Sequence, residues 1–331
     1  IPEISKADID DIMTNHKDML SNIIHYVEDP IEGRIFQLKY VREIERTIEY
    51  SIKKMLEKCS LKQNINIDDH IEGVFKLLCE RINSLGVPNN QKEEFLNTQK
   101  DIYRKALENG LLVITGGAGT GKTETIINLV DLYSRAGKKP IFIVTPTGKS
   151  ALVVEERLRN RGLLGNVAYV STIHRLLYSY YFEKFSSLRR EFKELVDLVD
   201  RTLNDIRFFG KFKDYITKNS KLKINPRVLI IDEASMVDEV LLALLFSIVN
   251  MDTLEHLIIV GDSNQLPPIG LGKPFVDIID FLHEKHDKLV VTLETPIRFP
   301  VKTGIWAFSQ AFTSTDNPID SPENYVDNTL K

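Results

Sequence analysis

An apolar run that ends directly in a glycine-rich loop constrains this chain more than any other feature. Residues 111–115 read Leu-Leu-Val-Ile-Thr, and residues 116–123 read Gly-Gly-Ala-Gly-Thr-Gly-Lys-Thr, which matches G-x-x-x-x-G-K-[ST] between a strand and a helix. Glycines let the backbone turn tightly and aim its N–H groups at phosphate oxygens. The pattern predicts a P-loop that binds ATP, and the alternative is a glycine-rich turn that matches by chance.

The residue types in this loop suit a nucleotide bound with a metal ion. Lys122 is predicted to reach the β- and γ-phosphates and to take part in catalysis, and the Thr123 hydroxyl is predicted to bind Mg²⁺. The predicted nucleotide contacts are Gly117, Ala118, Gly119, Thr120, Gly121, Lys122, Thr123 and Glu124. ATP and Mg²⁺ are therefore the expected cofactors.

A second apolar run, residues 228–231, ends in two adjacent carboxylates, Asp232 and Glu233. In P-loop enzymes one such carboxylate reaches the Mg²⁺ and another group acts on the attacking nucleophile. We predict that Asp232 is the metal ligand, partly through water, and that Glu233 acts on the attacking water. The pair also has a simpler interpretation, because such residues often cap a following helix.

A third apolar run, residues 256–260, leads into the polar loop Gly-Asp-Ser-Asn-Gln-Leu-Pro-Pro-Ile-Gly at residues 261–270. In an open α/β sheet, loops of this kind line the crevice at the carboxyl ends of the strands. Gln265 is therefore predicted to hydrogen-bond the γ-phosphate or the water. Its alternative is an ordinary turn residue held by the two prolines that follow.

Short apolar runs alternate with helical stretches after residue 90. The predicted strands are residues 111–115, 141–144, 167–170, 228–231, 257–260 and 289–293, and a helix is predicted over residues 92–109. Such alternation predicts an α/β fold, in which helices cover both faces of a mainly parallel sheet. The order of the strands is not readable from the pattern.

The first 90 residues have a different character. Apolar residues recur there at helical spacing, so we expect a small all-α domain over residues 1–90, before a motor domain over residues 91–295. Residues 1–98 hold 18 Asp and Glu against 13 Lys and Arg, which makes them a poor surface for DNA. Packing and contact with protein partners are their expected roles.

Composition limits the class of protein. The chain has 331 residues, of which 43% are apolar and 27% charged, so it is expected to bury a core and to be a soluble, globular monomer. No apolar run approaches the roughly 20 residues needed to cross a bilayer, and the first residues lack a signal-peptide pattern. A cytoplasmic location with no membrane contact is expected, and Cys59 and Cys79 are expected to be reduced thiols.

Five segments together resemble the motifs of RecD-like superfamily 1 DNA helicases. Besides the P-loop, they are Asp-Glu-Ala-Ser-Met at 232–236, Gly-Asp-x-x-Gln-Leu-Pro-Pro at 261–268, Thr-Pro-Thr-Gly-Lys-Ser-Ala at 145–151 and Ser-Thr-Ile-His-Arg-Leu-Leu at 171–177. The resemblance covers about residues 96–300 and implies a RecA-like P-loop NTPase fold. It also implies that Gln99 reads the adenine.

The resemblance further implies which residues contact single-stranded DNA. These are Pro146, Thr147, Thr172 and His174, although each is equally a candidate helix cap or core residue. Arg298 is similar to the arginine of motif IV, which completes the charge around the γ-phosphate as an arginine finger. The surrounding residues depart from the usual Phe-Arg-Gln, since Ile297 precedes this arginine and Phe299 follows it.

Residues 178–227 form a long insertion before the second anchor strand. They hold 12 Lys and Arg against 7 Asp and Glu, with ten aromatic residues among them. That composition predicts a subdomain that binds the DNA backbone and stacks on bases. The alternative is that the aromatic residues form the core of a helical insertion.

By the resemblance, the whole enzyme is expected to hydrolyse ATP, to move 5′ to 3′ on single-stranded DNA and to act at single-strand/double-strand junctions. Relatives continue with a second RecA-type domain, and nothing after Arg298 resembles its motifs. Residues 296–331 are therefore interpreted as the start of a truncated second motor domain, and this chain alone is expected to bind nucleotide without unwinding DNA. One alternative function is a P-loop ATPase with another task, such as an RNA or DNA remodeller or a loader. Another is a nucleotide-dependent binding module without turnover.

Overall fold

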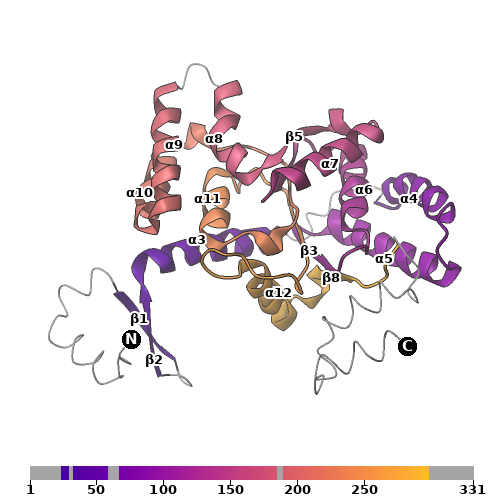
Figure 1. Cartoon of the computed structure of the whole chain (residues 1–331), viewed down its shortest axis with the longest axis horizontal. Coiled ribbons are helices and arrows are strands. Elements are labelled where there is room, and N and C mark those ends of the chain that lie inside the picture. Colours follow the sequence, from indigo (N-terminus) through magenta and orange to yellow (C-terminus); the bar gives the residue numbers. More distant parts are fainter. Residues whose placement is uncertain (1–23, 30–32, 59–66, 185–188, 298–331) are drawn as a thin grey trace.

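The computed structural model describes residues 24–29, 33–58, 67–184 and 189–297 (Figure 1). Its centre is a six-stranded sheet in which every neighbouring pair is parallel, in the order β5-β4-β6-β7-β3-β8. The strands are β3 (Leu111–Gly116), β4 (Ile141–Thr145), β5 (Val167–Thr172), β6 (Val228–Ile231), β7 (His256–Gly261) and β8 (Val290–Leu293). The predicted parallel sheet and all six predicted strands are confirmed.

Alternation along each strand divides the core into two halves. In β3, Leu111 and Val113 belong to one cluster of buried residues, while Leu112 and Ile114 belong to the other. This follows from the strand geometry, in which successive side chains point to opposite faces of the sheet. A sheet that is apolar on both faces must be covered on both.

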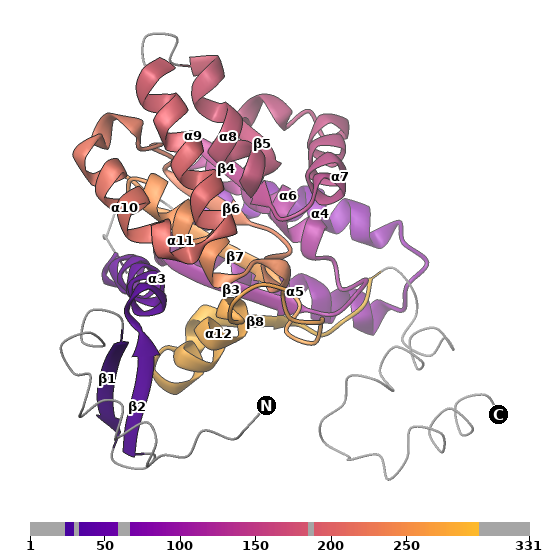
Figure 2. The same cartoon turned by 60° about the vertical axis from the view of Figure 1, so that its left-hand side comes forward.

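Helices supply that cover, as the two views of the molecule show (Figure 2). One side, here named the α6 face, carries α4 (Ile67–Asn83), α5 (Asn89–Glu108), α6 (Lys122–Arg135) and α7 (Gly148–Asn160). The other, named the α11 face, carries α3 (Lys39–Glu57), α8 (Ile173–Lys184), α9 (Arg189–Asn204), α10 (Phe209–Lys218), α11 (Glu239–Ile248) and α12 (Pro274–Lys285). The prediction of helices on both faces is confirmed.

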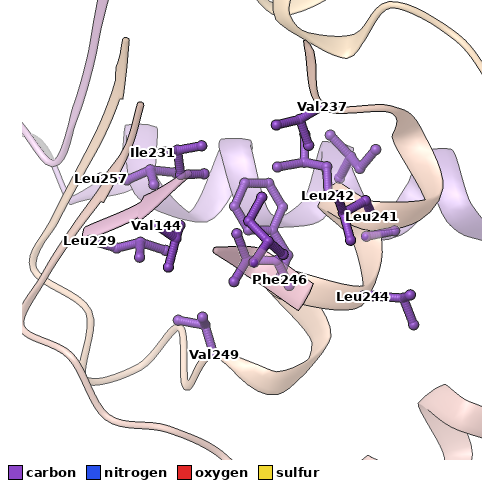
Figure 3. Packing of buried hydrophobic residues seen from close by; sticks show 14 of the residues in the cluster. Val144, Leu229, Ile231, Val237, Leu241, Leu242, Leu244, Phe246, Val249 and Leu257 are labelled. Carbon is purple, nitrogen blue, oxygen red and sulfur yellow. The ribbon is translucent and has the colours of Figure 1, made fainter. Parts of the chain in front are cut away.

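The α11 helix lies at the centre of its face. All nine residues from Val240 to Ile248 are buried, because α11 is covered by the sheet on one side and by other helices around it. Phe246, Leu242 and Val237 lie close to Val144 and Ile231 of the sheet (Figure 3). A helix that is apolar all round is stable only when it is enclosed in this way.

The expectation of an all-α segment before residue 90 is wrong for residues 24–38. Strands β1 (Ile24–Asp29) and β2 (Gly33–Leu38) form an antiparallel pair there. The sequence of β2, Gly-Arg-Ile-Phe-Gln-Leu, begins with glycine and contains a β-branched and an aromatic residue. Short apolar runs of this kind fit either a strand or a helix by periodicity alone, so the helical interpretation chose the wrong period.

The two described helices that lie before residue 90, α3 and α4, belong to different core clusters. Ile44, Ile48, Ile52 and Met55 of α3 are buried in the cluster of the α11 face. Ile71, Val74, Leu78 and Ile82 of α4 are buried in the cluster of the α6 face. A stripe of buried residues at three- and four-residue spacing only shows that a helix is covered, and here the six-stranded sheet supplies the cover.

The insertion at 178–227 is helical where the structure describes it, and it comprises most of α8 together with α9, η3 (Ile206–Phe208), α10 and η4 (Ser220–Leu222). Phe209 and Phe212 of α10 are completely buried, so these two aromatic residues belong to the core rather than to a stacking surface. Phe208 is half-buried, and the Nζ atom of Lys211 lies 5.0 Å from the centre of its ring.

Within the described residues, no helix is long and apolar enough to cross a membrane.

Candidate nucleotide-binding site

All six strands of the sheet deliver their carboxyl ends to the same edge, because every pair is parallel. The P-loop follows β3, Asp232 and Glu233 follow β6, and the loop with Gln265 follows β7. In the sheet β7 lies between β3 and β6, so the three loops are neighbours. The topology brings together groups that lie far apart in the sequence.

The P-loop has the left-handed backbone that only glycine adopts at little cost. Gly119 and Gly121 have φ angles of 84° and 94°, and α6 begins directly after Gly121. At Gly121 a Cβ atom would also lie 2.9 Å from Cδ1 of Ile297 and 3.0 Å from Cε2 of Phe95. Both the turn and the close packing therefore require glycine here.

Lys122 lies folded against its own loop. Its Nζ atom donates to the carbonyl oxygens of Gly116 at 2.6 Å and Gly117 at 3.0 Å. The same Nζ lies 4.0 Å from Oδ2 of Asp262, in the loop after β7. The ammonium group thus sits at the centre of the three loops, where the phosphates of a nucleotide would meet it.

Asp232 and Glu233 have unusual surroundings. The Asp232 side chain is buried, and this burial, together with the adjacent Glu233 charge, raises the pKa of Asp232 to about 6. Glu233 has a φ of 53°, the only positive φ of a non-glycine residue among those described, and its Oε2 atom is buried without a hydrogen-bond partner. Strain of this kind is typical of functional sites, where the surrounding structure holds a side chain in a required direction.

Gln265 is exposed at the mouth of the site. Its Oε1 atom accepts a hydrogen bond from the Ser235 hydroxyl at 3.1 Å. Because Ser235 follows Glu233 in the η5 turn (Ala234–Met236), this bond joins the loop after β7 to the loop after β6. The two predicted catalytic side chains, Glu233 and Gln265, line the same cavity.

This cavity has a volume of about 570 Å³, which suits a nucleotide. Its phosphate end is lined by Gly117, Ala118, Gly119, Gly121, Lys122, Thr123, Glu124, Glu233 and Gln265. Other parts of the cavity are lined by Arg81, Ile82, Ser84, Leu85, Arg157 and Arg161, and by Ile297 beside Gly121. The first set was predicted from the sequence, whereas the second was not, except that Ile297 was noted as a neighbour of Arg298.

The three arginines of this second set carry no motif. Arg81 belongs to α4, Arg157 to α7, and Arg161 follows α7, so only packing brings them together. Arg161 Nη2 donates to both Glu124 carboxylate oxygens at 2.6 and 2.7 Å, and Arg81 Nη2 lies 3.2 Å from Glu124 Oε1. A lone arginine in an amphipathic helix resembles any other solvated residue, so the sequence offered no signal for them.

Gln99 lies beside the site without lining the cavity. It is completely buried, and its Nε2 atom donates to the Thr125 hydroxyl of α6 at 2.7 Å. The Gln99 Oε1 atom has no hydrogen-bond partner among the described residues. Its predicted contact with adenine stays a prediction.

Thr147 and Thr172 lie at the carboxyl ends of β4 and β5, on the same edge as the P-loop. Each hydroxyl accepts from a backbone N–H three residues later, at 3.2 Å from Ser150 and 3.0 Å from Arg175. Both therefore cap the helices that follow. Pro146 is half-buried and His174 is exposed. A contact of these four residues with DNA stays a prediction.

Arg298 lies outside the described residues, but the segment before it is placed. The backbone N–H of Ile297 donates to the Gly119 carbonyl at 3.0 Å, and Gln91 Nε2 donates to the Pro296 carbonyl at 3.1 Å. The chain after β8 is thereby attached to the P-loop up to its last described residue.

The predicted metal ligands fit Mg²⁺ by their chemistry. Thr123 offers a hydroxyl oxygen at the start of α6, and Asp232 offers a buried carboxylate that is attracted by the Lys122 charge. Mg²⁺ prefers oxygen ligands, takes one or two from the protein and completes its shell with phosphate oxygens and water. Thr123 and Asp232 are the residues that would hold the ion.

Comparison with known proteins agrees with this geometry. The family described as AAA domain matches residues 99–271. An uncharacterized protein, MJ1519, of Methanocaldococcus jannaschii is 34% identical over 92% of this chain and 24% of its own length. The RecBCD enzyme subunit RecD of Haemophilus influenzae is 29% identical over 62% of this chain and 30% of its own. The ATP-dependent RecD2 DNA helicase of Deinococcus radiodurans is 27% identical over 57% of this chain and 21% of its own.

The chain thus spans between 21% and 30% of the length of these curated relatives. The matched range, residues 99–271, contains the P-loop, Asp232, Glu233 and Gln265. This chain belongs to the AAA domain family and, within it, to the RecD-like superfamily 1 helicases.

Proposed function

We propose that this chain is the ATP-hydrolysing part of a DNA helicase. One observation carries the proposal: a single cavity is lined by Lys122 of the P-loop, Glu233 after β6 and Gln265 after β7. These are the parts that phosphoryl transfer to water requires, namely a cation for the phosphates, a carboxylate and a polar group at the γ-phosphate. The name of the Deinococcus relative, an ATP-dependent DNA helicase, supports the same activity.

The binding step follows from the P-loop geometry. The N-terminus of α6 and the backbone N–H groups of the glycine-rich loop would surround the β- and γ-phosphates. Lys122 would exchange the carbonyl oxygens of Gly116 and Gly117 for phosphate oxygens. Mg²⁺, held by Thr123 and Asp232, neutralises charge on the phosphates when it is bound.

Two side chains, the carboxylate of Glu233 and the amide of Gln265, would carry out the hydrolytic step. Glu233 would orient the attacking water and accept its proton, since its Oε2 atom has no other partner among the described residues. Gln265 would hydrogen-bond the γ-phosphate or the water in place of Ser235. The link between Gln265 and Ser235 would then change with each cycle of hydrolysis. Arg298 would add a positive charge to the γ-phosphate.

The DNA would cross the neighbouring part of the same sheet edge. Thr145 of β4 pairs with Thr172 of β5, so the loops with Pro146, Thr147, Thr172 and His174 lie side by side. Because β4 also pairs with β6, a displacement of the Glu233 loop after β6 would be transmitted to this surface through β4. We propose single-stranded DNA and its junction with a duplex as the substrate, 5′ to 3′ movement, and a monomeric cytoplasmic protein whose first 90 residues contact protein partners.

The test combines nucleotide binding with turnover. Lys122→Ala should weaken Mg²⁺-ATP binding at least tenfold, because it removes the cation from the phosphates. Glu233→Gln should bind ATP within about threefold of the wild type, yet lower the hydrolysis rate by about 10² or more. Calorimetric titration and a phosphate-release assay measure the two effects, and Lys53→Ala on α3, far from the P-loop in sequence and exposed, is the matched control.

Two outcomes would contradict the proposal. Normal ATP affinity in Lys122→Ala would remove the P-loop from the site, and normal turnover in Glu233→Gln would remove the carboxylate from catalysis. Strand separation by the whole helicase, rather than by this chain alone, is expected from a duplex with a 5′ single-stranded tail and not from one with a 3′ tail. Hydrolysis without strand separation from either tail would favour a remodeller or loader.

A further inference from the structure

The nucleotide cavity is lined in part by residues that lie outside the matched family. Arg81 and Ile82 of α4, with Ser84 and Leu85 just after it, line the cavity opposite Arg157 and Arg161. The family match begins at residue 99, so this wall belongs to the region that the sequence assigned only to packing and partner contact. Nothing in the P-loop chemistry explains three arginines at this position.

One carboxylate organises this wall. Glu124, the third residue of α6, accepts from Arg161 at both of its oxygens, at 2.6 and 2.7 Å, and lies 3.2 Å from Arg81. Arg81 is fixed in turn by Asn128 of α6, whose Oδ1 accepts at 2.9 Å. The Glu124 side chain is only 14% exposed, so the two arginines hold it in one place. Charge-assisted bonds of this length also impose a direction.

The position of Glu124 along the cavity decides what it meets. It comes directly after Thr123, the predicted Mg²⁺ ligand, in α6, and it lines the same cavity as Arg81, Arg161, Ile82 and Leu85. A nucleotide bound with its phosphates on the P-loop extends through its ribose before it reaches its base. The ribose offers hydroxyl donors, and a fixed carboxylate is the group that proteins use to accept from them.

We infer that Glu124 accepts hydrogen bonds from the ribose hydroxyls of the bound nucleotide, and that Arg81 and Arg161 are positioning residues that aim its carboxylate. The inference rests on the proposed function, because it takes the ligand to be ATP. It gives α4 a role in nucleotide recognition: its Arg81 holds the ribose acceptor, and its end forms the wall beside the base.

The alternative is that these ion pairs only tie α4 and α7 to α6. Both roles would make Arg81→Ala or Arg161→Ala weaken ATP binding, so affinity alone does not separate them. The preference for ATP over 2′,3′-dideoxy-ATP does separate them, since only the recognition role depends on the ribose hydroxyls. A carboxylate that accepts from a hydroxyl should give the wild type a preference of about tenfold.

The experiment measures dissociation constants of both nucleotides with Mg²⁺ by calorimetry on the whole chain. Glu124→Ala should reduce the preference to about onefold, and Glu124→Gln should leave an intermediate value because its amide oxygen still accepts. Arg161→Ala and Arg81→Ala should each lower the preference several-fold. Arg161→Lys should restore it in part, since a lysine keeps the charge but not the two-pronged geometry.

Two matched controls break comparable ion pairs away from the cavity. Arg159→Ala, one position before the end of α7, removes an exposed pair with Glu155, and Arg104→Ala removes the pair between α5 and Asp68 of α4. Both should keep the wild-type preference. Thermal melting without nucleotide shows whether each variant is folded.

A wild type that binds both nucleotides equally would overturn the inference, as would an unchanged preference in Glu124→Ala. Equal weakening of both nucleotides in Arg81→Ala and Arg161→Ala would assign these residues to the structural role alone and overturn their positioning role. Failure of the proposed function looks different, because the wild type would then bind neither nucleotide and Lys122→Ala would change nothing.

Discussion

His256 shows how a single residue ties the stability of this protein to pH. It lies in β7 with its side chain buried, its ring centre is 4.9 Å from that of Tyr133, and its Nδ1 atom lies 3.0 Å from the Asn109 carbonyl oxygen. Burial lowers the pKa of His256 to about 4, because a charged imidazolium is poorly solvated there. The native protein therefore holds this histidine neutral over a range in which the unfolded chain protonates it.

The sign of the effect follows from proton counts. Between the unfolded pKa of about 6.5 and the folded value of about 4, the unfolded state binds more protons, so stability falls as pH falls through this range. We expect the wild type to lose about 2 kcal/mol more than His256→Asn between pH 7.5 and pH 5. Denaturant unfolding at the two pH values measures this loss in the free energy of unfolding, and His283→Asn at an exposed position is the control. Equal losses in wild type and His256→Asn would contradict this account.

At the scale of residues, the sequence predicted the catalytic side chains that come shortly after the end of a strand. Lys122, Asp232, Glu233 and Gln265 each follow an apolar run closely, so a motif fixes both their chemistry and their position. In the cluster of Glu124, Arg81 and Arg161, only Glu124 was predicted from the sequence. Arg81 joins the cluster because α4 packs on α6. Contacts made by packing leave no pattern at a fixed spacing.

At the scale of elements, three of the described aromatic residues of the insertion, Phe192, Phe209 and Phe212, are buried and so are not available to stack on bases. The Nζ atom of Lys213 in α10 lies 4.0 Å from Oε1 of Glu43 in α3, so the Glu43 carboxylate already neutralises part of the Lys213 charge. Lys211 is exposed and packs only against the half-buried ring of Phe208. Lys211 is therefore better suited than Lys213 to meet a phosphate of the DNA backbone.

Reversal of this charge gives the test of the insertion. Lys211→Glu should weaken binding of single-stranded DNA about three- to tenfold and reduce the slope of log K against log salt by about one. Fluorescence anisotropy at several salt concentrations measures both. Lys100→Glu is the matched control, because Lys100 of α5 also lies over an aromatic ring, Phe75, on the other face of the sheet. An unchanged affinity and slope in Lys211→Glu would remove α10 from the DNA path.

The elements also show where sequence patterns are ambiguous. The six strands of the sheet were predictable because each is a short apolar run between turns and helices. Their order was not, since every one of these strands is apolar and no residue records its neighbour. The strands β1 and β2 were missed because their apolar residues also fit a helical spacing.

At the scale of the whole molecule, the core around the six-stranded sheet extends beyond the matched family. Residues 99–271 supply most of the sheet, but α3 covers the α11 face and β8 forms one edge of the sheet. Met55 and Ile44 of α3 are completely buried and belong to the same cluster as α11. Helices α3 and α4 are therefore part of the fold on which the nucleotide site stands.

This dependence predicts how the protein responds to loss of α3. Met55→Ala should lower the free energy of unfolding by about 2 to 5 kcal/mol, because it leaves a cavity against the sheet, whereas Tyr50→Ala on the exposed side of the same helix should change it little.

A chain that starts at residue 90 retains every predicted catalytic residue, yet it would expose the apolar α11 face to water. We expect it to aggregate or to melt without cooperativity. Calorimetric melting and ATP titration of the shortened chain test this, and a cooperative transition at the wild-type temperature with normal ATP affinity would show that α3 and α4 form a separable domain after all.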